Sequence, residues 1–257
     1  MRKLMMLLLW VPLLAWGQSP FDGTWKVNID AAQFPSKPDV FIYQNGMYTC
    51  KTCRPPHTLK ADGEWHKIAG DPFMDEMMVK IVDDKHSEQA TRKNGKETGV
   101  VKISLSDDGK TRTIDFVDKT SPNGKEVSGK SVETQVAPGP PGSLPLSGSW
   151  RTEKVSDLPS EALLFTYKST SDGMDFTTPT GQSYSAKFNG GFVPIQGDVA
   201  NTLVSIKKVG PNTLQETNKR GGKIVGVGTM VVEGNKMTMH FEDKEQGTTM
   251  KMVAEKQ

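Results

Sequence analysis

The segment NGKETGVVKISLSDDGKTRTIDFV, residues 94–117, shows the pattern that decides the fold. Asn94-Gly95 and Asp108-Gly109 are turn dipeptides, because these residue types tolerate the positive φ that two-residue hairpin loops require. Apolar and polar residues alternate over 101–105 and again over 113–117. A period of two, bounded by turn glycines, is typical of antiparallel strands with one buried face.

The chain of 257 residues repeats this plan. A shift of 127 aligns residues 46–100 with 173–227 without gaps, and 13 of the 55 aligned positions are identical. Composition alone would give about three or four identities, so the excess indicates an internal duplication. No window keeps a 3.6-residue period over three turns. We therefore predict an all-β protein of two tandem antiparallel up-and-down β-barrels, each of about eight to ten strands and closed or nearly closed.

The boundaries of these barrels follow from composition. Residues 136–145, VAPGPPGSLP, are rich in proline and glycine. Such a segment forms neither helix nor sheet and is predicted to be a semi-rigid linker. The first barrel is accordingly expected over residues 18–135 and the second over residues 146–257.

Residues 1–17 have the layout of a secretory signal peptide. Arg2 and Lys3 precede an apolar run over 4–14, and a small-x-small cleavage site ends at Gly17. The run is shorter than the roughly 20 residues of a membrane span. We expect cleavage after Gly17, no membrane insertion of the mature chain, and a secreted or periplasmic protein.

Charge excludes one class of partner. The whole chain carries 32 Lys and Arg against 30 Asp and Glu, and loss of Arg2 and Lys3 makes it formally neutral. Nucleic acids are bound through a concentrated basic face, so we expect no nucleic-acid partner. The sequence does not identify a protein partner.

Each half opens with the same short motif, Gly23-Thr24-Trp25 and Gly148-Ser149-Trp150. Gly-x-Trp at the start of the first strand of a meander barrel resembles the lipocalin (calycin) superfamily. The chain is also similar to duplicated exported bacterial proteins. The resemblance implies that Trp25 and Trp150 are buried plugs at one end of each barrel, and that a barrel can hold a small ligand. It also implies an arginine from the last strand over each tryptophan, but the expected last strands, near 131–136 and 250–254, carry none.

The segment Cys50-Lys51-Thr52-Cys53 is the most conspicuous local feature. In the second half it falls on an ordinary turn over 177–180, so the fold does not require it. In an oxidising compartment two thiols this close are expected to form a disulfide. A redox role is the alternative, although Pro55-Pro56 prevents the helix that lowers a thiol pKa in thioredoxin-type motifs. A zinc site would need His57 and His66 as further ligands.

Four methionines flank the turn expected around residues 244–247. A hairpin there is predicted to place Met239 opposite Met250 and Met237 opposite Met252, on the inward face of the sheet. Methionine fills irregular cores well, whereas four thioethers on one face could also bind a soft ion such as Cu(I). Core packing is the preferred interpretation.

The sequence has no G-x-S-x-G, no H-E-x-x-H and no recurring carboxylate pair, and the phosphate-loop pattern at 124–131 is followed by a strand-like segment and not by a helix. We therefore expect no enzyme, no catalytic residues, no cofactor and no metal. The leading hypothesis is non-covalent binding of a small apolar or amphipathic ligand in a barrel. One alternative is a structural or protein-interaction module of the cell envelope whose barrels are filled by side chains. Another is a redox or metal role of the Cys50–Cys53 turn. A carrier predicts a cavity of several hundred cubic ångströms, whereas an interaction module predicts an exposed apolar patch.

Overall fold

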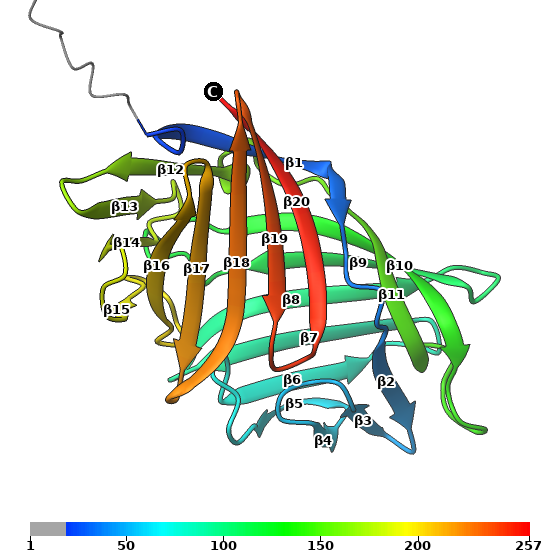
Figure 1. Ribbon diagram of the computed structural model, residues 1–257. Coiled ribbons are helices and arrows are strands. Elements are labelled where there is room, and N and C mark those ends of the chain that lie inside the picture. The colour runs from blue at the N-terminus through cyan, green and yellow to red at the C-terminus, as the bar shows by residue number, and fades with distance from the viewer. Residues whose placement is uncertain (1–18) are drawn as a thin grey trace, which may run out of the picture.

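The computed structural model describes residues 19–257, and the signal peptide predicted at 1–17 lies outside the described residues. Twenty strands form two antiparallel sheets of ten strands each, which confirms the all-β prediction. A short 3-10 helix, η1 (Ser160–Leu163), accompanies them. In Figure 1 the long strands of one sheet run upright and those of the other run across the view.

The first sheet, called barrel A, contains β1 (Gly23–Gln33), β12 (Leu164–Ser169), β13 (Gly173–Thr177), β14 (Ser183–Lys187), β15 (Val193–Pro194), β16 (Leu203–Gly210), β17 (Thr213–Arg220), β18 (Lys223–Glu233), β19 (Lys236–Asp243) and β20 (Thr248–Lys256). Its strand order is β14-β13-β12-β1-β20-β19-β18-β17-β16-β15. A bridge between Ser183 and Gln196 connects the two edges, so this sheet is nearly closed.

The second sheet, called barrel B, contains β2 (Asp39–Gln44), β3 (Met47–Cys50), β4 (His57–Lys60), β5 (Asp62–Lys67), β6 (Glu76–Ile81), β7 (His86–Lys93), β8 (Lys96–Leu105), β9 (Thr111–Asp118), β10 (Val127–Pro138) and β11 (Gly148–Ser156). Its strand order is β4-β3-β2-β11-β10-β9-β8-β7-β6-β5. The edge strands β4 and β5 are joined by Ala61 alone, so this sheet is nearly closed as well.

The two halves of the chain exchange their first strands. Strand β1 pairs with β12 and β20 of barrel A, with Gly23 opposite Tyr167 and Val27 opposite Ala254. Strand β11 pairs with β2 and β10 of barrel B. Figure 1 shows β1, in blue, beside β20, in red. The predicted boundaries at 18–135 and 146–257 therefore do not match the barrels, because local turn signals do not fix the partner of a strand that lacks a tight turn.

The proline- and glycine-rich segment 136–145 does not separate the barrels, which corrects the predicted linker. Its first residues complete β10, where Pro138 lies opposite Gly148 of β11 in the same sheet. The loop that follows is held against barrel B, because Leu144 N donates to Tyr43 O at 2.8 Å. The prolines end a strand here, and the connections between the barrels are instead residues 34–38 and 157–163.

Each tryptophan of the repeated motif is buried in the barrel built mainly by the other half. Trp25 is fully buried in barrel A, and Trp150 is 1% exposed in barrel B. The indole N–H of Trp25 donates to Phe21 O at 2.8 Å, and that of Trp150 donates to Leu146 O at 3.2 Å. Their burial confirms both as core residues.

The hairpin of β19 and β20 has a different register from the predicted one. Met239 lies opposite Met252 and Met237 lies opposite Ala254, because the turn over 244–247 places Asp243 opposite Thr248. The observed register differs from the predicted one by two residues. Because side chains alternate between the two faces of a strand, the methionine side chains still lie on the expected face. Met237 and Met239 are buried in the core of barrel A, as packing predicts.

Candidate functional site

A pocket of about 550 Å³ lies at the end of barrel B that faces the loops of barrel A. We call it pocket B. Its floor comes from β7, β8 and β9, and its rim includes loops of both barrels, among them the two loops of barrel A that contain Gln182 and Asp198. Its lining includes Asp71, Phe73, Gln89, Thr91, Gly99, Val101, Phe116, Asp118 and Asp198.

Barrel A has the corresponding pocket, of about 560 Å³, which we call pocket A. The two pockets are lined by equivalent positions of the repeat. A shift of 127 aligns Thr91 with Asn218 and Gly99 with Gly226, and a shift of 125 aligns Phe116 with Phe241. Duplication of the fold therefore also duplicated the pocket.

The two pockets adjoin each other. Asp71, Phe73 and Asp198 line both of them, and Asp71 and Asp198 are equivalent positions of the repeat. Asp71 Oδ1 accepts a hydrogen bond from Phe73 N at 2.8 Å, and Asp198 Oδ2 accepts one from Thr202 N at 2.7 Å. These bonds fix the loops that form the shared rim.

Contacts between the barrels surround the pockets. Asn123 Nδ2, from barrel B, donates to Pro179 O of barrel A at 2.7 Å. Arg54 Nε donates to Glu245 O at 3.3 Å. The pockets are thus part of the junction between the barrels.

Glycines position the aromatic floor of each pocket. Gly129 lies opposite Phe116, and a Cβ at Gly129 would lie 2.5 Å from Phe116 Cζ. Gly228 lies opposite Phe241, and a Cβ there would lie 3.0 Å from Phe241 Cε1. Each ring therefore occupies space that a side chain at the facing glycine position would fill.

Gly99 leaves part of pocket B empty. A Cβ at this position would lie 3.4 Å from Thr91 Oγ1, which is an ordinary van der Waals contact. Its backbone is not in the left-handed region, so a larger residue fits the conformation. A side chain at position 99 would extend into the pocket, which makes this glycine suitable for a blocking substitution.

A buried polar group lies deeper in each barrel, at equivalent positions. In barrel B, Gln89 is 9% exposed and its Nε2 donates to Tyr43 Oη at 2.7 Å. In barrel A, Glu216 Oε1 accepts hydrogen bonds from Tyr167 Oη, at 2.6 Å, and from Tyr184 Oη. Burial raises the pKa of Glu216, and burial raises the pKa of both tyrosines well above their usual value.

An ion pair distinguishes the core of barrel B. Arg112, which is 2% exposed, contacts Glu133 Oε2 through Nη2 at 2.6 Å and through Nε at 2.7 Å. Its guanidinium lies 4.7 Å from the ring centre of Trp150. An arginine therefore does pack over this tryptophan, but it comes from β9 and not from the last strand. Barrel A has Met237 and Ala254 at the equivalent pair of positions.

The cysteine turn forms the expected disulfide. Cys50 and Cys53 are bonded with their Cα atoms 5.5 Å apart. His57 lies opposite Cys50 in the sheet, whereas His66 is paired with Asp62 at 2.8 Å and does not join them. Among residues 19–257, no group of three or more His, Cys, Asp and Glu side chains is arranged to hold a metal ion. The described part of the chain also contains no helix that is long and apolar enough to cross a membrane.

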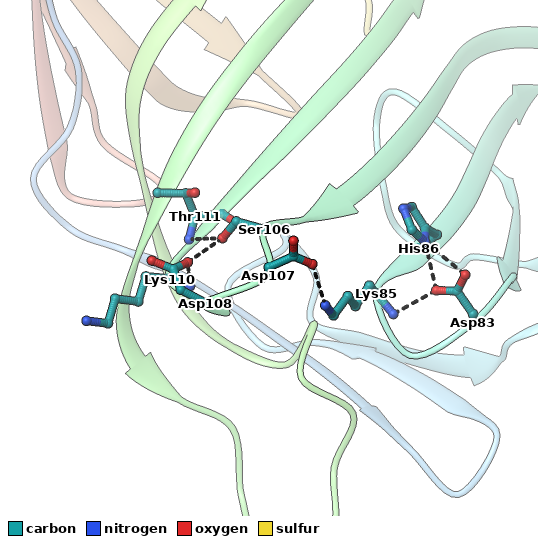
Figure 2. Close-up of polar contacts among 8 residues, drawn as sticks. All are labelled: Asp83, Lys85, His86, Ser106, Asp107, Asp108, Lys110 and Thr111. Carbon is teal, nitrogen blue, oxygen red and sulfur yellow. Dashed lines mark hydrogen bonds and ion pairs between the residues drawn. The ribbon is translucent and has the colours of Figure 1, made fainter.

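Figure 2 shows a charged surface cluster at the turns after β6 and β8. Asp83 Oδ1 accepts hydrogen bonds from Lys85 N and His86 Nδ1, both at 2.8 Å, and these bonds lower the pKa of Asp83. Lys85 Nζ pairs with Asp107 Oδ1 at 2.8 Å, which lowers the pKa of Asp107 and raises the pKa of Lys85. These side chains cap turns and pair with one another, so the pockets are the stronger candidate site.

No known protein family, curated protein or solved structure matches this chain.

Proposed function

We propose that this protein is a non-enzymatic binding protein that holds small amphipathic ligands in pockets A and B. The proposal rests on the presence of two pockets at equivalent positions of the repeat, with volumes of about 550 and 560 Å³. Small-molecule sites in proteins have volumes of roughly 300–1,000 Å³ and combine apolar walls with a few polar groups. Both pockets fit this description, with a phenylalanine in the floor and carboxylates at the rim. The expected export to the periplasm or medium is compatible with a carrier.

Binding can be tested with N-phenyl-1-naphthylamine, a neutral probe that fluoresces in apolar surroundings. We expect one probe in each pocket of the wild-type protein. Gly99→Leu should remove binding at pocket B, and Gly226→Leu should remove binding at pocket A. Gly191→Leu is the matched control, because a Cβ there has no neighbour within 4 Å and the residue lines neither pocket.

Two results would reject the proposal: a wild-type protein that does not bind the probe, or a Gly99→Leu/Gly226→Leu double variant that binds it normally. Cooperative thermal unfolding shows whether each variant folds. Thr91→Leu is a second blocking variant for pocket B, because Thr91 lines the same wall.

A protein-interaction module is the second candidate. It is supported by Phe73, which is 48% exposed at the junction and lines both pockets. In that case Phe73→Ser would weaken association with a protein partner, and the Gly99→Leu/Gly226→Leu double variant would not. A redox role has less support, because Cys50 is fully buried.

A further inference from the structure

We infer that pocket B selects ligands whose apolar body carries a protonated amine. This inference rests on the proposed function and adds the charge of the ligand. Pocket B is lined by three carboxylates, those of Asp71, Asp118 and Asp198, and its lining residues include no lysine or arginine. The mature chain is expected to be formally neutral, so this concentration of negative charge is local.

The three carboxylates keep one oxygen each for a ligand. Asp71 and Asp198 each use one oxygen to hold their own loops, and Asp118 Oδ1 accepts a hydrogen bond from Thr120 N at 2.7 Å. None of the three forms an ion pair with another residue of the described chain. Lys93 Nζ approaches Asp71 but donates to its backbone carbonyl oxygen, at 3.3 Å.

A buried polar group that lines the pocket is also an acceptor. Gln89 is 9% exposed and uses its amide nitrogen for Tyr43, whereas its carbonyl oxygen accepts no hydrogen bond from residues 19–257. Carboxylates and carbonyl oxygens only accept hydrogen bonds. A ligand that complements this wall must donate hydrogen bonds, and a cationic donor also neutralises the charge.

The apolar part of the ligand has a defined place. Val101 lies opposite both Gln89 and Phe116 in the sheet, and Asp118 follows Phe116 by two residues on the same strand. An alkyl or aromatic body can pack on this floor while its ammonium group contacts the rim.

Pocket A provides an internal comparison. Two arginines line it, and Arg220 Nη1 pairs with Glu245 Oε2 at 3.1 Å while its guanidinium lies 4.7 Å from the ring centre of Phe73. Pocket A is also lined by five carboxylates, those of Asp71, Asp198, Glu242, Asp243 and Glu245, so the linings of the two pockets have the same formal charge. The amine preference is argued for pocket B because none of its carboxylates has a cationic partner within residues 19–257, whereas Glu245 of pocket A is paired with Arg220.

The test uses octylamine, octanol and octanoate as competitors of N-phenyl-1-naphthylamine at neutral pH. The Gly226→Leu background leaves pocket B as the occupied site. We expect octylamine to displace the probe at about tenfold lower concentration than octanol, with octanoate weakest, because each accessible ion pair changes affinity by roughly two- to fivefold. The advantage of octylamine should decrease as salt is added.

Asp118→Asn should lower the octylamine-to-octanol affinity ratio about threefold. Asparagine keeps a side-chain oxygen for the Thr120 N–H, so the turn is retained; Asp198→Asn is a second variant of the same kind. Asp115→Asn is the matched control, since Asp115 is on the same strand but faces outward and does not line pocket B.

Failure of the inference differs from failure of the proposed function. Probe binding with equal displacement by octylamine and octanol would overturn the amine preference and leave ligand binding in place. If Asp115→Asn and Asp118→Asn lowered the octylamine-to-octanol affinity ratio equally, the amine preference would also be overturned, because the overall charge of the protein would then explain the effect. Absence of probe binding in the wild-type protein would reject both.

Discussion

Trp25→Ala is expected to destabilise the half of the chain that does not contain it. Trp25 is fully buried in barrel A, where its strand lies between β12 and β20. Truncation of a buried aromatic side chain to alanine costs about 3–5 kcal/mol. That range includes about 1 kcal/mol for the lost indole hydrogen bond to Phe21 O. The total is a large part of the roughly 5–15 kcal/mol by which domains are stable.

Native-state hydrogen exchange with mass spectrometry can locate this loss. In Trp25→Ala, amides of residues 164–256 should exchange faster, and amides of residues 39–138 should change much less. Trp150→Ala is the mirror experiment, because Trp150 is buried in barrel B. It should accelerate exchange over 39–138 and spare 164–256.

The opposite pattern would refute the exchange of first strands. Suppose that Trp25→Ala accelerated amide exchange over 39–138 and Trp150→Ala accelerated amide exchange over 164–256. Each half of the chain would then form a barrel with its own first strand. The predicted boundaries at residues 135 and 146 would then be correct.

Four further variants test the interior. Burial raises the pKa of Glu216 above its usual 4.5, so the folded chain holds this proton more tightly than the unfolded chain. The stabilisation that the protonated Glu216 provides is therefore complete at pH values below 4.5. The free energy of unfolding then decreases as pH rises through the raised pKa, by at most about 1.4 kcal/mol per pH unit. Glu216→Gln should remove this fall in urea unfolding measured across pH, and an unchanged profile would contradict the assignment. Arg112→Met alone should cost about 3–5 kcal/mol, because it leaves Glu133 buried without its partner. Adding Glu133→Ala, which copies the apolar pair of barrel A, should restore most of the stability; a further loss in the double variant would show that the ion pair itself is required. Replacing Cys50 and Cys53 by serine should lower the free energy of unfolding by about 2 kcal/mol or less, since the closed loop is short. Far-UV circular dichroism should not change, and loss of the β signal would show that the disulfide is needed for folding.

Local patterns predicted the strands and turns well. Asn94-Gly95 is the two-residue turn between β7 and β8, and Asp108-Gly109 lies in the five-residue connection, 106–110, between β8 and β9. Short connections of this kind make the next strand the neighbour. The connection over 34–38 has no such turn, so nothing local fixes the partner of β1. Both halves also begin with the same Gly-x-Trp strand, and this motif marks burial without specifying which barrel receives it.

The candidate site was harder to predict. A ligand was expected inside a barrel, whereas the pockets lie at the barrel ends, where loops of both barrels meet. Curvature and loop packing determine these spaces, and neither follows from the periodicity of a strand. Repeated pairs were the available signal: Gly99 and Gly226 leave space, and Asp71 and Asp198 form the shared rim.

Strand exchange and the shared rim together make the two barrels one structural unit. A chain that lost either half would leave the other barrel without its tryptophan strand and both pockets without part of their rim. A ligand in either pocket contacts loops of both barrels, so its binding free energy stabilises the junction as well as one barrel. The interiors of the two barrels differ. Barrel B has Gln89 where barrel A has Glu216, and barrel B has the Arg112–Glu133 ion pair where barrel A has apolar residues. Duplication of the scaffold with separate interiors therefore permits two pockets of similar volume to be lined by different residues.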